Sequence, residues 1–113
     1  MGSTMGMIGE IQPEELAQRL NAGEAVVLVD VREPWEVTIA SLTGAIHIPL
    51  GTVPSGAERL DPDSEIIVFC HHGIRSLTAC QLLAGQGFKR LRNLTGGIDA
   101  WSVRIDPTIP RYA

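Results

Sequence analysis

Cysteine and long apolar runs are scarce in this sequence. The 113 residues include two cysteines, Cys70 and Cys80, which are too few for a disulfide framework and favour free thiols in a reducing compartment. No run approaches the roughly 18 apolar residues of a membrane span. Residues 1–7 lack the charged and apolar regions of a signal peptide. These absences predict a soluble, cytoplasmic protein with no membrane partner.

An overall excess of positive charge is also missing. The chain has 9 basic and 13 acidic residues, a net charge of -4 and a pI near 5.2. This balance argues against nucleic acid as a partner. The acids are unevenly distributed, however, because residues 66–98 contain no Asp or Glu. The basic residues of that stretch are Arg75, Lys89, Arg90 and Arg92. Their concentration predicts a local positive field that favours a small anion.

The length limits the chain to one domain. With 113 residues and 44% hydrophobic content, it can bury one apolar core without a disulfide or a metal. Internal repeats and linker-like stretches are not found. We expect residues 8–113 to form the domain, and residues 1–7 to be a flexible N-terminus or a remnant of expression cloning.

Continuous apolar runs predict the strands of a parallel sheet. The apolar runs cover residues 25–29, 45–48 and 66–69, and residues 8–11 and 91–94 are weaker strand candidates. Helical patterns lie between these runs, and such alternation is typical of an α/β fold. The sequence therefore predicts a single α/β domain with a five-stranded, mostly parallel sheet and helices on both faces.

Two helices have clear signals. The first begins at Pro13 and carries a Glu15/Arg19 pair at i,i+4 spacing, and the second covers residues 76–86 and ends at a glycine. The apolar face expected for the second helix comprises Leu77, Cys80, Leu83 and Ala84. Shorter helical turns are predicted after residue 34 and over residues 54–60 and 97–103.

The carboxyl ends of the predicted strands carry the unusual residues of the chain. In open parallel sheets, ligands bind beyond these ends. Residues 30–32, 70–75 and 95–97 each follow a predicted strand, so they should meet at one edge of the sheet. There we interpret Asp30 and Arg32 as a structural ion pair that fixes the edge. His47, in an apolar strand, is interpreted as a structural histidine.

The segment after residues 66–69 combines a cysteine with a loop suited to anions. Gly73 is free to adopt a positive φ, which turns backbone N–H groups inward, and the following helix adds roughly half a positive charge at its N-terminus. Such a loop stabilises a thiolate and predicts that Cys70 is a nucleophile, the alternative being an inert buried cysteine. Cys80, on the apolar helix face, is predicted to be a core residue.

Two other uses of this loop are less consistent with the sequence. Cys70, His71 and His72 are adjacent and cannot easily converge on one tetrahedral ion, so we expect neither a metal nor another cofactor. Protein tyrosine phosphatases place one residue more between their Cys and Arg than the four that separate Cys70 from Arg75. The shorter loop favours an adduct smaller than phosphate.

Four segments in order resemble the single-domain rhodaneses, a sulfurtransferase family. Cys70-His71-His72-Gly73-Ile74-Arg75 is similar to the family's catalytic loop, Cys-x-x-Gly-x-Arg/Thr. Residues 30–36, 44–49 and 94–101 are similar to its Asp-Val-Arg-Glu, Gly-Ala-x-x-Ile-Pro and Gly-Gly-x-x-x-Trp segments. The resemblance spans about residues 8–112. It departs at residues 40–42, where Ala-Ser-Leu stands in place of a frequent Gly-His-Ile.

The resemblance implies a sulfurtransferase that moves sulfane sulfur from thiosulfate or a persulfide to cyanide or a thiol through a persulfide on Cys70. Backbone N–H groups of residues 71–75 would hold the transferred sulfur. The Arg75 side chain would bind the anionic donor, or would only brace the loop. His71 and His72 would supply positive charge or protons, or would only shape access. The substrate-binding residues implied in this way are His71, His72, Gly73, Ile74 and Arg75.

Partners and alternatives follow from the same resemblance. The implied ligand is a small anionic sulfur donor such as thiosulfate, and candidate protein partners are a cysteine desulfurase, a thioredoxin or a sulfur-carrier protein. One alternative is a non-catalytic rhodanese-like module that binds a regulatory partner, although such modules usually lack the cysteine that is present here as Cys70. The other is a phosphatase or arsenate reductase that acts on an oxyanion.

Overall fold

A single parallel sheet forms the centre of the molecule. The computed structural model describes residues 8–113, so the prediction for residues 1–7 lies outside the described part. The sheet has the strand order β1-β5-β4-β2-β3, with every pair parallel. The strands are β1 (Gly9–Ile11), β2 (Val27–Asp30), β3 (Ile46–His47), β4 (Ile66–Phe69) and β5 (Leu91–Leu94). The predicted five-stranded sheet is therefore confirmed.

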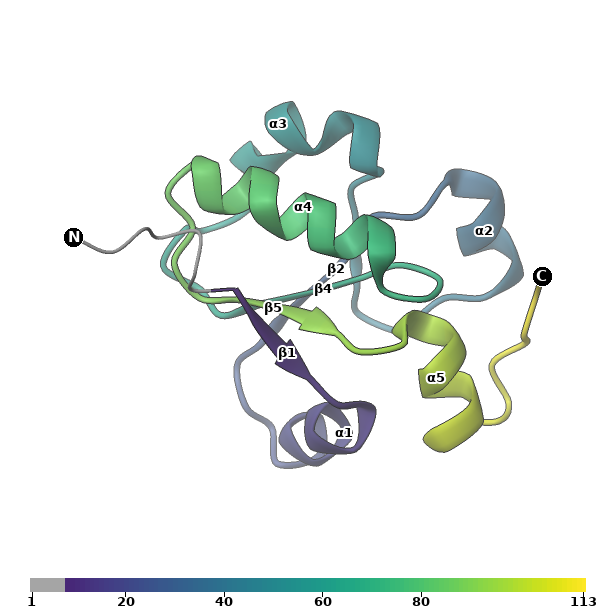
Figure 1. The fold of residues 1–113 in the computed structure, drawn as a ribbon. Coiled ribbons are helices and arrows are strands. Elements are labelled where there is room, and N and C mark those ends of the chain that lie inside the picture. Colours follow the sequence, from purple (N-terminus) through teal and green to yellow (C-terminus); the bar gives the residue numbers. More distant parts are fainter. Residues whose placement is uncertain (1–7) are drawn as a thin grey trace.

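Helices cover both faces of this sheet. The helices are α1 (Pro13–Asn21), α2 (Pro34–Ile39), α3 (Val53–Gly56), α4 (Ile74–Gly85) and α5 (Gly97–Arg104), with short 3-10 turns at Leu50–Thr52 and Ala57–Arg59. Figure 1 shows α3 and α4 on one side of the strands and α1 and α5 on the other. Both α1 and α2 begin at a proline. The N–H groups of the first helical residues have no hydrogen-bond partner within the helix, so the lack of an N–H on proline is tolerated there. None of the helices in residues 8–113 is long and apolar enough to cross a membrane.

Alternate side chains of β4 build the two halves of the core. Ile66 and Val68 pack with the α3 and α4 side, whereas Ile67 and Phe69 pack with the α1 and α5 side. This alternation follows from the two-residue period of a strand. All four side chains are fully buried, as expected for the central strand of a parallel sheet. The burial fixes where β4 ends, and therefore where Cys70 begins the next loop.

Two local predictions about the helices are wrong. Leu77 is 39% exposed, because the buried stripe of α4 runs through Ser76, Ala79, Cys80, Leu83 and Ala84 and leaves Leu77 beside it. The Glu15/Arg19 pair is also not formed. Arg19 instead donates to the carboxylates of Glu24 and Glu65, and Glu15 accepts from Arg92. Tertiary partners have replaced the weak i,i+4 pair.

Candidate active site

Cys70 lies directly after β4, with its sulfur at the N-terminus of α4. The backbone N–H of Gly73 donates to its Sγ at 3.1 Å, and that of Ser76 donates at 3.3 Å. Gly73 adopts a φ of 107° as the residue before the helix, which turns the loop back over the sulfur. Cys70 is only 1% exposed. The predicted amide loop around this cysteine is therefore present in the structure.

A buried polar chain supports the loop from the neighbouring strand. Ser76 Oγ lies 3.3 Å from Cys70 Sγ and donates to Asn93 Oδ1 at 2.5 Å. The Asn93 amide donates in turn to the carbonyl of Gly73 at 3.0 Å. Ser76 and Asn93 are both buried. Their hydrogen bonds fix the loop and the first turn of α4 against β5.

The start of α5 holds the other side of the loop. Gly96 and Gly97 have φ values of 76° and 64°, and the backbone N–H groups that follow turn toward the loop. Ile98 N donates to the carbonyl of Cys70 at 2.9 Å, and Asp99 N donates to that of His71 at 3.1 Å. A Cβ atom on Gly97 would overlap both carbonyl oxygens. The close approach of α5 to the loop therefore requires glycine at this position.

The Arg75 guanidinium is bound by a carboxylate from α2. Its two terminal nitrogens donate to the two oxygens of Glu36, at 2.6 and 2.7 Å. The Tyr112 hydroxyl donates to Glu36 at 2.7 Å. The ion pair with Arg75 is the main reason that the pKa of the Glu36 carboxyl is lowered to about 2. In this arrangement the planar fork of Arg75 faces Glu36 and links the loop to α2.

The ring of His71 lies against two other rings. It lies parallel to Tyr112 with a centroid distance of 3.9 Å, and the His72 ring lies 3.9 Å away on a tilt of 34°. Burial, followed by the proximity of His72, lowers the pKa of His71. This shift favours the neutral form of the His71 ring. His72 is exposed at the surface of the loop.

The predicted structural pair at the edge of the sheet is confirmed. Arg32 is completely buried and donates through Nε and Nη2 to the two carboxylate oxygens of Asp30, at 2.9 and 2.7 Å. Its remaining terminal nitrogen donates to the Tyr112 hydroxyl at 3.0 Å. His47 Nε2 donates to the Arg32 carbonyl at 2.7 Å, in the structural role expected for it. These residues frame the site without facing the sulfur of Cys70.

The Rhodanese-like domain model matches residues 12–104. The chain belongs to this family. A sulfurtransferase of Allochromatium vinosum is 38% identical over 96 residues, which are 85% of this chain and 90% of the relative. The thiosulfate sulfurtransferase GlpE of Pseudomonas putida is 35% identical over 89 residues, which are 79% of this chain and 81% of the relative.

Solved structures agree with the family assignment. A rhodanese-like domain protein from Staphylococcus aureus matches with a TM-score of 0.80 and 26% identity, over 93% of this chain and 99% of that one. The fold is thus a rhodanese fold, and the named relatives place the chain among the rhodanese sulfurtransferases in general. The family resemblance carried by the four sequence segments is confirmed.

The two cysteines of this rhodanese have different surroundings. Cys80 lies within the core between α4 and the sheet, as predicted, and burial raises the pKa of its thiol to about 12. Cys70 instead lines a pocket of about 300 Å³ together with His71, His72, Ile74 and Arg75. Within residues 8–113, no group of three or more His, Cys, Asp or Glu side chains is arranged to hold a metal ion.

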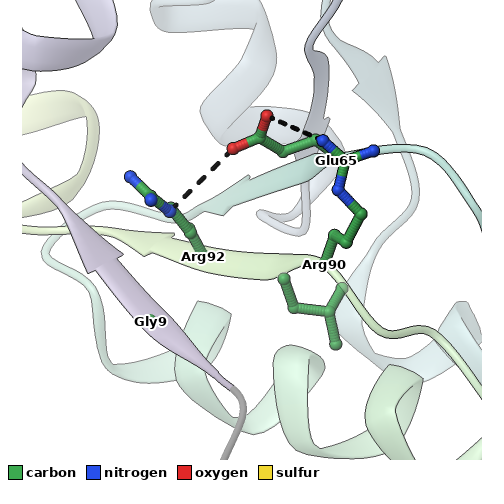
Figure 2. A pocket seen from close by; sticks show the side chains of 5 residues that line it. Gly9, Glu65, Arg90 and Arg92 are labelled. Atoms are coloured by element: carbon green, nitrogen blue, oxygen red, sulfur yellow. Dashed lines mark ion pairs between the residues drawn. The ribbon is translucent and has the colours of Figure 1, made fainter.

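The positive field predicted for residues 66–98 is largely cancelled in the folded rhodanese. Arg75 is paired with Glu36. Arg90 and Arg92 both face Glu65: Arg90 Nη2 lies 3.5 Å from Oε1 of this carboxylate, and Arg92 Nε lies 3.9 Å from Oε2. Figure 2 shows both arginines facing this carboxylate at the start of β4. Arg92 also pairs with Glu15 at 3.0 Å. The acids all precede residue 66 in the sequence, so an acid-free stretch of sequence does not produce an acid-free surface.

Four residues of the rhodanese site were not identified as site residues from the sequence. From the sequence alone, Glu36 is only one position of the 30–36 motif, and Ser76 is only the first residue of a predicted helix. Asn93 and Tyr112 have no predicted role. Asn93 did offer a signal, because a polar residue in a short buried strand must find hydrogen-bond partners. Tyr112 offered none, since it follows α5 in the tail and reaches the site only through the tertiary fold.

Proposed function

We propose that this rhodanese carries sulfane sulfur as a persulfide on Cys70. The Cys70 thiolate attacks the outer sulfur of thiosulfate or of a persulfide donor. The sulfur–sulfur bond of the donor breaks, and its electron pair leaves with sulfite or with the donor thiolate. An acceptor, cyanide or a thiolate, then attacks the outer sulfur of the Cys70 persulfide and restores the thiolate.

One observation carries this proposal. The Cys70 sulfur accepts hydrogen bonds from the N–H groups of Gly73 and Ser76, at 3.1 and 3.3 Å, at the N-terminus of a 12-residue helix. Fixed donors and the helix dipole favour a thiolate there, and they also favour an anionic persulfide. The pocket beside Cys70 gives room for one added sulfur atom. Within residues 8–113, no N–H group is found to donate to the sulfur of Cys80, which lies in the core.

The loop residues have the following proposed roles. Cys70 is the catalytic residue, and His71, His72, Gly73, Ile74 and Arg75 bind the transferred sulfur through their backbone N–H groups. The first-turn N–H groups of α4 have no carbonyl partner within the helix, so they are suited to this role. The Arg75 side chain holds the loop through Glu36. Residues 8–113 constitute the functional domain.

The physiological setting is part of the proposal. The donor is a small anionic compound such as thiosulfate or a persulfide, with thiosulfate supported by the name of the Pseudomonas putida relative. A cysteine desulfurase, a thioredoxin or a sulfur-carrier protein is the proposed protein partner. Both cysteines are free thiols, as is usual for proteins of a reducing compartment, which supports a cytoplasmic location.

Intact-mass spectrometry tests the persulfide directly. The reduced protein is exposed briefly to thiosulfate and then to cyanide, in parallel with Cys70→Ser and Cys80→Ser. We expect the wild type and Cys80→Ser to gain the mass of one sulfur atom and to lose it with cyanide, and Cys70→Ser to gain nothing. Loading of all three proteins would refute the role of Cys70. Turnover of p-nitrophenyl phosphate or arsenate in preference to thiosulfate and persulfides would instead indicate a phosphatase or reductase.

A further inference from the structure

We infer that Glu36 determines donor specificity at this site by neutralising Arg75, so that the site discriminates against the second negative charge of thiosulfate. This inference rests on the proposed sulfur transfer through Cys70. It concerns a side chain that does not touch the reacting sulfur, and it names the favoured donors as sulfane-sulfur compounds with a single negative charge. Persulfides of small thiols and thiosulfonates are donors of this class.

The geometry leaves Arg75 little freedom to meet a donor. Both terminal nitrogens of its guanidinium are engaged by Glu36, whose side chain is 3% exposed. Glu36 is itself held by two further donors. The Tyr112 hydroxyl donates to one oxygen at 2.7 Å and the backbone N–H of Glu33 donates to the other at 3.0 Å. A carboxylate fixed by four hydrogen bonds cannot turn away when an anion enters.

Two other arginines near the loop are also paired with carboxylates. Arg32 is paired with Asp30, and Arg111 is paired at 2.9 Å with Asp99, whose backbone N–H binds the loop at His71. The remaining favourable groups are uncharged backbone N–H donors and the N-terminus of α4. These donors match a single negative charge on the transferred sulfur. None of these paired arginines is an uncompensated cation that could bind the second negative charge of thiosulfate, which is on its sulfonate end.

Thiosulfate and methanethiosulfonate form a matched pair of donors for this test. Both present an outer sulfur bonded to a sulfonyl sulfur, but thiosulfate carries two negative charges and methanethiosulfonate carries one. Attack by the Cys70 thiolate gives the same persulfide in both reactions, and the electron pair of the broken sulfur–sulfur bond leaves with sulfite or with methanesulfinate. The ratio of kcat/KM for thiosulfate to that for methanethiosulfonate therefore reports the effect of the extra charge.

Two variants at the ion pair test the inference. In Glu36→Gln, Arg75 keeps its charge and loses its counter-ion, so we expect the ratio to rise about tenfold through a lower KM for thiosulfate. This size is expected for one unit charge at roughly 10 Å and an effective dielectric constant of about 20. In the double variant Glu36→Gln/Arg75→Gln, both charges are removed, and the ratio should return to within about twofold of the wild type. A donor-binding Arg75 would instead lower the ratio in the double variant.

Glu65→Gln is the matched control. Glu65 is a mostly buried carboxylate that also binds arginine side chains, but it precedes β4 whereas Cys70 follows it. Its substitution should leave the donor ratio unchanged. Circular dichroism and thermal unfolding establish that each variant is folded before its kinetics are compared.

The salt dependence of the wild type gives a second test that needs no substitution. If Arg75 is neutralised, ionic strength should change kcat/KM by a similar, small factor for both donors. A clearly steeper fall for thiosulfate would overturn the inference, as would an unchanged ratio in a folded Glu36→Gln. If neither donor loads sulfur onto wild-type Cys70, the proposed function fails, which is a different result from loading with an unaltered donor ratio.

Discussion

Gly97 offers the sharpest structural test of how the catalytic loop is held. In Gly97→Ala, a methyl group is placed on a residue with a φ of 64° and against the carbonyl oxygens of Cys70 and His71. Relief of this overlap requires α5 and the loop to separate. The separation breaks the hydrogen bonds from Ile98 N to Cys70 O and from Asp99 N to His71 O.

The expected cost has two parts. A left-handed conformation costs a residue with a Cβ atom about 1–2 kcal/mol. The two lost hydrogen bonds add about 1 kcal/mol each, so Gly97→Ala should lower the free energy of unfolding by about 3–4 kcal/mol. Because the loop carries the N–H groups proposed to hold the transferred sulfur, a displacement of about 1 Å should slow sulfur loading on Cys70 on the order of 100-fold.

Gly23→Ala is the control for this substitution. Gly23 also has a left-handed φ, of 75°, but nothing lies within 4 Å of the position where its Cβ would stand. It should therefore show only the conformational cost and should load sulfur at the wild-type rate. Urea unfolding measures the stability of both variants, and time-resolved intact mass measures the loading. Equal effects of the two substitutions on stability and on loading would refute the argument that α5 holds the loop through Gly97.

Two further predictions concern buried polar groups of the site. The folded pKa of Glu36, about 2, lies below the usual 4.5, so its contribution to stability is complete above about pH 4.5 and is lost as the pH falls toward 2. The stability advantage of the wild type over Glu36→Gln should shrink by about 3 kcal/mol across that window, and a constant difference would contradict the ion-pair assignment. Ser76→Ala leaves the buried Oδ1 of Asn93 without its donor, so urea unfolding should show a loss of about 1–3 kcal/mol. The exposed hydroxyl of Ser55 provides a control, because Ser55→Ala should change stability by less than about 0.5 kcal/mol, and equal losses would count against the buried chain.

The position of Cys70, the proposed nucleophile, could be predicted because it depends on local sequence. The bounds of β4 and β5 agree with the predicted residues 66–69 and 91–94. The continuous apolar run of β4 is typical of a buried parallel strand. Once β4 is placed, Cys70 must lie at its carboxyl end and Gly73 must turn the loop. The prediction of a strand over residues 25–29 was less exact. The observed strand, β2, begins at Val27 and ends at Asp30.

The partners of the charged residues could not be predicted, because each is distant in the sequence. Arg75 and Glu36 are 39 residues apart, and Arg19 and Glu65 are 46 residues apart. A local rule offers Arg19 the nearby Glu15, yet the folded chain brings a mostly buried carboxylate to it. A long-range ion pair of this kind becomes visible only when the strand order is known.

The C-terminal tail connects both ion pairs of the site through one hydroxyl group. Tyr112 donates to Glu36 and accepts from Arg32, while its ring stacks on His71 of the loop. Burial is the main reason that the pKa of this phenol is raised to about 12, so the hydroxyl keeps the proton that it donates. The rigidity of the loop therefore depends on a residue that no strand or helix positions. A sulfur carrier needs such rigidity, because uncharged N–H donors stabilise an anionic sulfur only when they are already directed at it.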